Sequence, residues 1–180
     1  LMAVKFRGAH IDGRRNPSAL FAALELLSSK AEISPDSIHL RFIGRFGNEV
    51  HEMFATTSFS SSIEVIGYVP HEKSISYLLV SDVLLLIVDE AKESEEIVPG
   101  KVYEYIGSFK PVIAIAPTHG AIADLMNETR AGGIAHQSDI EGIANIIREM
   151  YIAFKEGKSL AQPNIEAIKG YERRESTRKL

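Results

Sequence analysis

The chain has 180 residues, of which 45% are hydrophobic and 24% charged, a composition that suits one globular domain with its own core. It contains no Cys, which excludes disulfide frameworks and Cys-ligated metal sites and is compatible with an intracellular compartment, so we expect a cytoplasmic protein. The formal net charge of −4 offers no basic footprint for nucleic acid, and no apolar run is long enough to cross a bilayer, so no membrane contact is indicated.

Six short apolar runs have the composition of β-strands. In chain order they lie at 3–6, 38–43, 63–66, 83–88, 112–116 and, more weakly, 133–135. The runs at 83–88 and 112–116 are apolar throughout, which is typical of parallel strands that are buried on both faces.

Helical patterns fill the gaps between these runs. Asn16 and Pro17 open the first helix, with Asn as the N-cap and Pro at the first helical position. Further helices are expected at 48–57, 71–80, from Pro99, at 121–129, after Asp139 and at 164–180. Repeated strand–helix alternation predicts right-handed βαβ units, hence an α/β fold with a Rossmann-like doubly wound parallel six-stranded sheet and helices on both faces. We expect residues 1–180 to form a single domain.

Doubly wound sheets bind ligands beyond the carboxyl ends of their strands. The loops to inspect are therefore 7–16, 44–48, 67–71, 89–99 and 117–121. The first strand is not followed by Gly-x-Gly-x-x-Gly, and the chain has no Walker loop, Ser nucleophile elbow or Asp-x-Asp metal clamp. These absences argue against a dinucleotide site and against a metal-held diphosphate.

Two glutamates eight residues apart, Glu96 and Glu104, flank the start of the fourth predicted helix. The spacing alone says little, because it recurs elsewhere in the chain. Their context is more informative: Pro99 and Gly100 begin a helix, and its free N–H groups and positive dipole end suit an anion. Glu104 would then lie about one turn into the helix, where it can bind a polyol while phosphates face the N-terminus.

Lys101 falls in the first turn of the same predicted helix. A cation at this position opposes the helix dipole, and a bound diphosphate would reverse the sign of that effect. We therefore predict that Lys101 contacts a diphosphate. The alternative is that Lys101 points to solvent and pairs with Glu93 or Glu95.

The stretch from Glu96 to Ala114 resembles the donor-binding domain of family 4 glycosyltransferases, which have the GT-B fold. That domain carries Glu-x7-Glu, then a short helix and a Lys-Pro-Val-Ile-Ala strand, which here is 110–114. The resemblance covers most of the chain. Gly8, Arg14 and Arg15 resemble the family's first loop, which holds a basic residue for the diphosphate.

Two further loops and the end of the chain extend the resemblance. Gly44 and the loop Gly67-Tyr68-Val69-Pro70 resemble the family's glycines after its second and third strands, and base choice would rest on backbone groups there, including those of Val69. Residues 171–180 resemble the helix that crosses back to the acceptor domain. The chain departs from the pattern at Ala9, where the family often has Arg after the glycine, and at 119–120, where it has Gly-Gly.

The resemblance implies the C-terminal, nucleotide-sugar-binding half of a retaining glycosyltransferase of the hexosyltransferase type. Its partners would be a nucleoside-diphosphate sugar and the N-terminal acceptor-binding domain of the same polypeptide, which this chain lacks. Glu104 would bind the ribose hydroxyls, Glu96 would contact the sugar near the reacting carbon, and Arg14 or Arg15 would hold the diphosphate. No cofactor and no metal are expected, because Arg, Lys and a helix N-terminus can neutralise the leaving diphosphate.

Other interpretations of these residues remain open. The two glutamates and the two arginines of the first loop could be ordinary surface charges, and Tyr68 is expected to pack rather than to stack on a base. A nucleotide-sugar epimerase of similar fold would bind the same donor. A non-catalytic α/β module such as a receiver would bind no nucleotide, but it would want clustered acids after the first strand, where only Asp12 stands beside Arg14 and Arg15.

Overall fold

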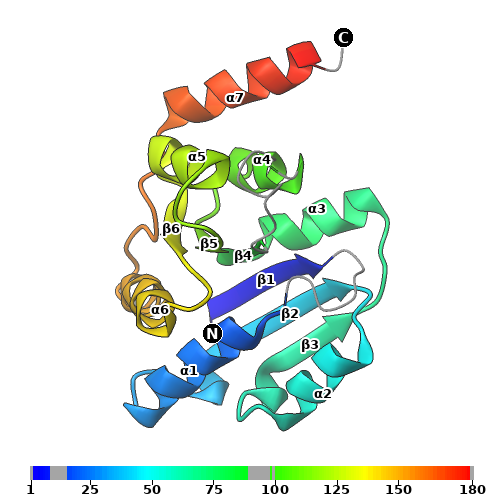
Figure 1. Ribbon diagram of the computed structural model, residues 1–180, viewed down its shortest axis with the longest axis vertical. Coiled ribbons are helices and arrows are strands. Elements are labelled where there is room, and N and C mark those ends of the chain that lie inside the picture. The colour runs from blue at the N-terminus through cyan, green and yellow to red at the C-terminus, as the bar shows by residue number, and fades with distance from the viewer. Residues whose placement is uncertain (1, 9–15, 89–97, 99, 179–180) are drawn as a thin grey trace.

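The computed structural model describes residues 2–8, 16–88, 98 and 100–178. Its strands form one sheet in the order β3-β2-β1-β4-β5-β6, and every neighbouring pair is parallel (Figure 1). The strands are β1 (Met2–Gly8), β2 (Ile38–Gly44), β3 (Ile63–Ile66), β4 (Val83–Ile87), β5 (Val112–Ile115) and β6 (Gly132–Ala135). The predicted α/β class with parallel strands is confirmed.

Seven helices alternate with the strands within the described part of the chain. They are α1 (Ser18–Ser29), α2 (Asn48–Thr56), α3 (His71–Leu79), α4 (Gly100–Gly107), α5 (Ala121–Thr129), α6 (Ile140–Lys155) and α7 (Ile165–Arg178). Two 3-10 turns, η1 (Pro35–Ser37) and η2 (Ser60–Ser62), precede β2 and β3. Strand and helix bounds agree with the predicted ones to within one or two residues, which is the usual uncertainty of an element's end.

The core is split into two layers by the sheet, as β4 shows most clearly. All five of its residues are buried. Val83, Leu85 and Ile87 pack with residues of α1, α2 and α6, whereas Leu84 and Leu86 pack with residues of α3, α4, α5 and α7. Figure 1 shows the same two helical layers on either side of the sheet. Burial on both faces explains why this strand is apolar throughout.

Local capping signals place several helix starts. The Asp139 carboxylate accepts a hydrogen bond from the Gly142 N–H at 2.8 Å, which confirms the predicted cap of α6. The predicted start of α1 is wrong by one residue: Pro17 is the N-cap rather than the first helical residue, and Asn16 precedes the cap. The Asn16 side chain still accepts a hydrogen bond from the Ser18 N–H at 2.8 Å, because it lies within reach of the first turn. Both side chains satisfy N–H groups that have no partner inside the helix.

A charged cluster ties β2, β3 and α3 together on the face of the sheet that α3 covers. Glu64 accepts a hydrogen bond from Arg41 Nε at 2.7 Å, and its carboxylate lies 2.8 Å from His39 Nε2. The Arg41 guanidinium also lies over the Tyr77 ring, 5.2 Å from its centroid. The hydrogen bond from Arg41, followed by that from His39, holds the pKa of Glu64 below its usual value.

Replacing Glu64 with Gln is expected to lower the free energy of unfolding slightly at neutral pH. The side chain is 41% exposed, so solvent screens the pair and the loss should be about 0.2–1 kcal/mol. A carboxyl whose pKa is lower in the folded state stabilises the fold above its unfolded pKa, about 4.3. That contribution is lost as the pH falls through the lower, folded pKa.

Urea unfolding of the wild type and of Glu64→Gln, from neutral pH to below the unfolded pKa of about 4.3, measures the effect. The difference between the two should shrink toward zero in the most acidic buffers. Glu52→Gln, an exposed position on α2, is the matched control and should leave the free energy of unfolding unchanged. A difference that stays constant with pH would contradict the electrostatic explanation.

Candidate functional site

The candidate site lies at the carboxyl ends of the strands, where the strand order reverses. β1 pairs with β2 on one side and with β4 on the other, so the connections that follow β1 and β4 lead to opposite faces of the sheet. A crevice forms at such a switch point and is the usual ligand position in this class of sheet. Most of the two predicted ligand loops 7–16 and 89–99, namely residues 9–15, 89–97 and 99, lies outside the described residues.

Glycines end the first two strands at this edge. Gly8 and Gly44 are register partners at the carboxyl ends of β1 and β2. Gly44 has a φ of 137°, which is a conformation that residues with a Cβ rarely adopt. Gly67 directly follows β3, and a Cβ added to it would meet no atom within 4 Å, so the space beside it is open. Gly44 and Gly67 therefore both lie at the carboxyl edge of the sheet, and their predicted role in base binding remains a prediction.

Changing Gly44 to Ala is expected to lower the free energy of unfolding by about 1–3 kcal/mol, because the side chain forces a strained backbone conformation at the end of β2. Chemical denaturation measures the loss. Gly47→Ala is the control, because Gly47 has a φ of −70° and open space around it. The free energy of unfolding of this variant should change little. Equal losses at the two positions would show that Gly44 is not conformationally required.

Helix α4 carries two of the predicted ligand-binding side chains. The helix begins at Gly100, it has no acidic residue in its first turn, and Lys101 lies in that turn as expected. Its buried side chains are Val102, Tyr105 and Ile106. Lys101 and Glu104 remain partly exposed, with the Glu104 side chain 33% accessible. The apolar face therefore fixes the helix on the sheet and leaves Glu104 accessible to a ligand.

Glu104 faces the start of α3. Its Oε1 atom lies 4.0 Å from Nε2 of His71, and the His71 side chain is 61% exposed. Since His71 is the first residue of α3, it directly follows the loop Gly67–Pro70. The fold thus brings Glu104 of α4 near the end of the loop that follows β3. Sequence reasoning did not select His71, although its position just after that loop, at a predicted helix start, was a usable signal.

The loop after β3 differs from expectation at one residue. Tyr68 was expected to be a packing residue, but its ring is 74% exposed, so that expectation is wrong. The next residue, Val69, is partly buried. The Tyr68 ring faces solvent because its loop lies at the rim of the sheet and not over the core.

The remaining predicted site residues cannot be placed. Arg14, Arg15, Glu96 and Pro99 lie outside the described residues, and their roles remain predictions. Within the part of the chain that the structure describes, no three His, Asp or Glu side chains gather into a group able to hold a metal ion. No helix among those residues has the length and apolar character needed to cross a membrane.

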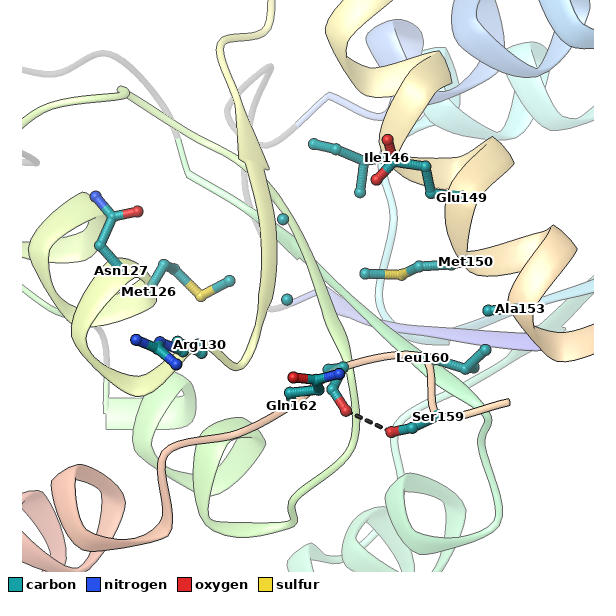
Figure 2. A pocket seen from close by; sticks show the side chains of 13 residues that line it. Met126, Asn127, Arg130, Ile146, Glu149, Met150, Ala153, Ser159, Leu160 and Gln162 are labelled. Atoms are coloured by element: carbon teal, nitrogen blue, oxygen red, sulfur yellow. Dashed lines mark hydrogen bonds between the residues drawn. The ribbon is translucent and has the colours of Figure 1, made fainter. Parts of the chain in front are cut away.

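A cavity of about 450 Å³ opens at the opposite end of the sheet (Figure 2). Met126 and Arg130, near the end of α5, line it from one side, and Glu149 and Met150 of α6 from the other. Gly132, where β6 begins, also borders it, so the cavity sits at the amino ends of the strands. It is therefore separate from the edge at which Gly44, the loop after β3 and Glu104 lie.

Comparison with known proteins places the fold. No protein-family model and no curated protein matches this chain. Among solved structures, sucrose-phosphate synthase from Thermosynechococcus elongatus is similar with a TM-score of 0.69 and 16% identity, over 94% of this chain and 41% of that one. The HepE protein of Anabaena, solved in complex with UDP and glucose, is similar with a TM-score of 0.65 and 16% identity, over 88% of this chain and 41% of that one.

A third structure matches over most of both chains. It is the C-terminal domain of a glycosyl transferase group 1 family protein, LpcC, from Francisella tularensis, with a TM-score of 0.65 and 16% identity over 94% of this chain and 85% of that domain. By contrast, the chain covers only 31–44% of the length of three other glycosyltransferase structures that it resembles. The chain has the fold of a GT-B C-terminal domain.

Proposed function

We propose that this chain is the nucleotide-sugar-binding domain of a retaining, metal-independent glycosyltransferase related to family 4. The observation that carries the proposal is the position of Glu104. This glutamate lies on α4 at the carboxyl edge of a GT-B-like sheet and faces the loop that ends β3. A donor bound there would place its ribose at Glu104 and its base beside the backbone of Gly44, Gly67 and Val69.

The proposed reaction joins an acceptor hydroxyl oxygen to the anomeric carbon of the donor sugar. The bond between that carbon and the diphosphate oxygen breaks, the electron pair leaves with the diphosphate, and the hydroxyl proton passes to the leaving diphosphate. Negative charge therefore develops on the leaving diphosphate. Lys101, the N-terminus of α4 and Arg14 or Arg15 would stabilise that charge, while Glu96 would contact the sugar beside the reacting carbon.

The same proposal assigns the acceptor to a second domain of the polypeptide. Three glycosyltransferase structures similar to this chain are more than twice as long as the region that it matches. The acceptor-binding wall of the cleft would come from an N-terminal domain, in a cytoplasmic enzyme. Because orientation of both substrates supplies much of the catalysis in such a transfer, the 180-residue chain alone should not turn over.

We expect this chain to bind at least one of UDP, ADP and GDP, with the same Kd in the presence of Mg²⁺ and of EDTA. The reason is that the predicted diphosphate contacts are cationic side chains and helix N–H groups. Isothermal titration calorimetry with the three nucleotides measures this directly. An absolute requirement for a divalent metal would overturn the metal-independent mechanism, and failure to bind any of the three would favour a non-catalytic module.

A further inference from the structure

The cavity in Figure 2 lies along the outer edge of the sheet. Met126 of α5 belongs to the core on one face of the sheet, and Met150 of α6 belongs to the core on the other face. Both helices line the cavity of about 450 Å³, so it must extend around the edge strand between them, which is β6. Gly132 and Gly133 of β6 also line it, and without side chains they leave the strand's backbone accessible from the cavity.

Gly132 directs its backbone N–H and C=O groups away from the sheet. The Ala131 carbonyl accepts a hydrogen bond from the Val112 N–H of β5 at 2.8 Å. The Ala135 carbonyl accepts one from the Ala116 N–H, just beyond β5, at 3.0 Å. Backbone groups of successive strand residues point to alternate sides, so those of Gly132 point away from β5. The cavity lies on that side, because Gly132 lines it at the sheet's edge.

The neighbouring chain segment does not pair with this edge. Residues 156–164 connect α6 to α7, and Leu160 and Gln162 of this connection line the cavity. In the described part of the chain, no backbone hydrogen bond joins the connection to β6. Its Asn164 N–H donates instead to the Thr129 carbonyl of α5, at 2.7 Å. A strand edge with an unused donor and acceptor is a template for pairing with a further strand.

The side chains around the cavity select the kind of strand that fits. The inner wall is apolar, with Met126 1% and Met150 5% exposed, and suits an apolar side chain. Arg130 follows α5, two residues before Gly132, and its side chain is exposed and forms no ion pair with any described residue. A guanidinium binds a carboxylate through two parallel hydrogen bonds. Glu149 lines the opposite wall and disfavours a second negative charge there.

We propose that this edge of β6 binds the extended carboxyl terminus of a partner polypeptide that ends in an apolar residue. The peptide runs antiparallel to β6, because that direction brings its carboxylate to Arg130 at the amino end of the strand. One peptide residue opposite Gly132 exchanges both backbone hydrogen bonds with it, and an apolar side chain lies against Met126 and Met150. This inference is independent of the proposed function, because the cavity lies at the opposite end of the strands from the donor site.

The test titrates the isotopically labelled 180-residue chain with acetyl-Ala-Ala-Leu, which has a free carboxylate, and follows the backbone amide signals by NMR. The signals of Gly132 and Gly133 should shift. The amidated form of the same peptide should bind about three- to tenfold more weakly, because it lacks the charge that Arg130 contacts. A peptide methylated on its backbone nitrogens should not bind, because it cannot donate to the Gly132 carbonyl.

Arg130→Gln separates recognition of the carboxylate from the structure of the cavity. This variant should bind the free acid as weakly as the wild type binds the amide, and its affinity for the amide should equal that of the wild type. Arg45→Gln is the matched control, because Arg45 is an exposed arginine that follows β2 at the carboxyl edge of the sheet. It should bind both peptides as the wild type does.

Several results would overturn the inference. Equal affinity of the wild type and Arg130→Gln for the free acid would show that the guanidinium does not hold the carboxylate. Free leucine that binds as tightly as the peptide would make the cavity an amino-acid site and not a strand-binding edge. Dimers that Arg130→Gln dissociates would assign the edge to a second copy of the chain. The absence of any shift at Gly132 and Gly133 would show that β6 pairs with no peptide.

Discussion

Glu104→Ala will weaken nucleoside diphosphate binding by roughly ten- to hundredfold and leave the fold intact. A carboxylate that accepts hydrogen bonds from two ribose hydroxyls contributes about 1.5–3 kcal/mol, since charge-assisted hydrogen bonds are stronger than neutral ones. The Glu104 side chain lies on the accessible flank of α4, whose packing depends on its buried apolar residues, so its removal opens no cavity in the core. Titration calorimetry measures the affinity, and thermal unfolding reports on the fold.

Glu149→Ala provides the matched control for this experiment. In the sequence, Glu149 follows Glu141 by eight residues, the spacing that also separates Glu96 and Glu104. Glu149, however, lies on α6 beside the cavity at the amino ends of the strands. Its replacement should leave nucleotide binding unchanged. Equal losses of affinity from Glu104→Ala and Glu149→Ala would show that the ribose is not held by α4.

Phe42→Ala is expected to cost about 3–5 kcal/mol of unfolding free energy, which is the range for truncating a buried aromatic side chain. Phe42 is 1% exposed on β2, and its ring centroid lies 4.5 Å from that of Phe54. Two more rings, those of Phe21 and Phe46, lie 6.1 Å and 6.0 Å away. A cavity inside this aromatic cluster would be lined on several sides, which limits how far the structure can close over it.

The loss should appear as a fall in Tm of about 6–20 °C for a chain of this size. Calorimetry or urea unfolding measures it. Phe109→Ala is the control, because Phe109 is 47% exposed and its removal should cost clearly less than that of Phe42. A loss at Phe42 as small as that at Phe109 would mean that the aromatic cluster does not stabilise β2. That strand also carries Gly44 to the site, so its anchoring matters for binding.

Most helix and strand positions could be predicted from the sequence, because they depend on residues that are neighbours along the chain. Continuous apolar character over 83–88 predicts a strand buried on both faces, and β4 has that environment. Asp139 predicts a helix start, since its carboxylate can reach the first free N–H groups of that helix, and it accepts from Gly142. Pro99 as a first helical residue predicts that Lys101 lies in the first turn of the following helix, and Lys101 lies in the first turn of α4.

Contacts between distant segments depended on the tertiary structure. The pairing of β1 with both β2 and β4 brings α3 and α4 together and sets His71 beside Glu104, although neither residue carries a periodic signal that points to the other. Tyr68 was also expected to pack, whereas the position of its loop at the rim of the sheet leaves the ring exposed. The sequence by itself determined which segments are buried and where helices begin, because burial and capping depend on neighbouring residues. The tertiary structure alone decided which side chains meet at the carboxyl edge, because that depends on the order in which the strands pair.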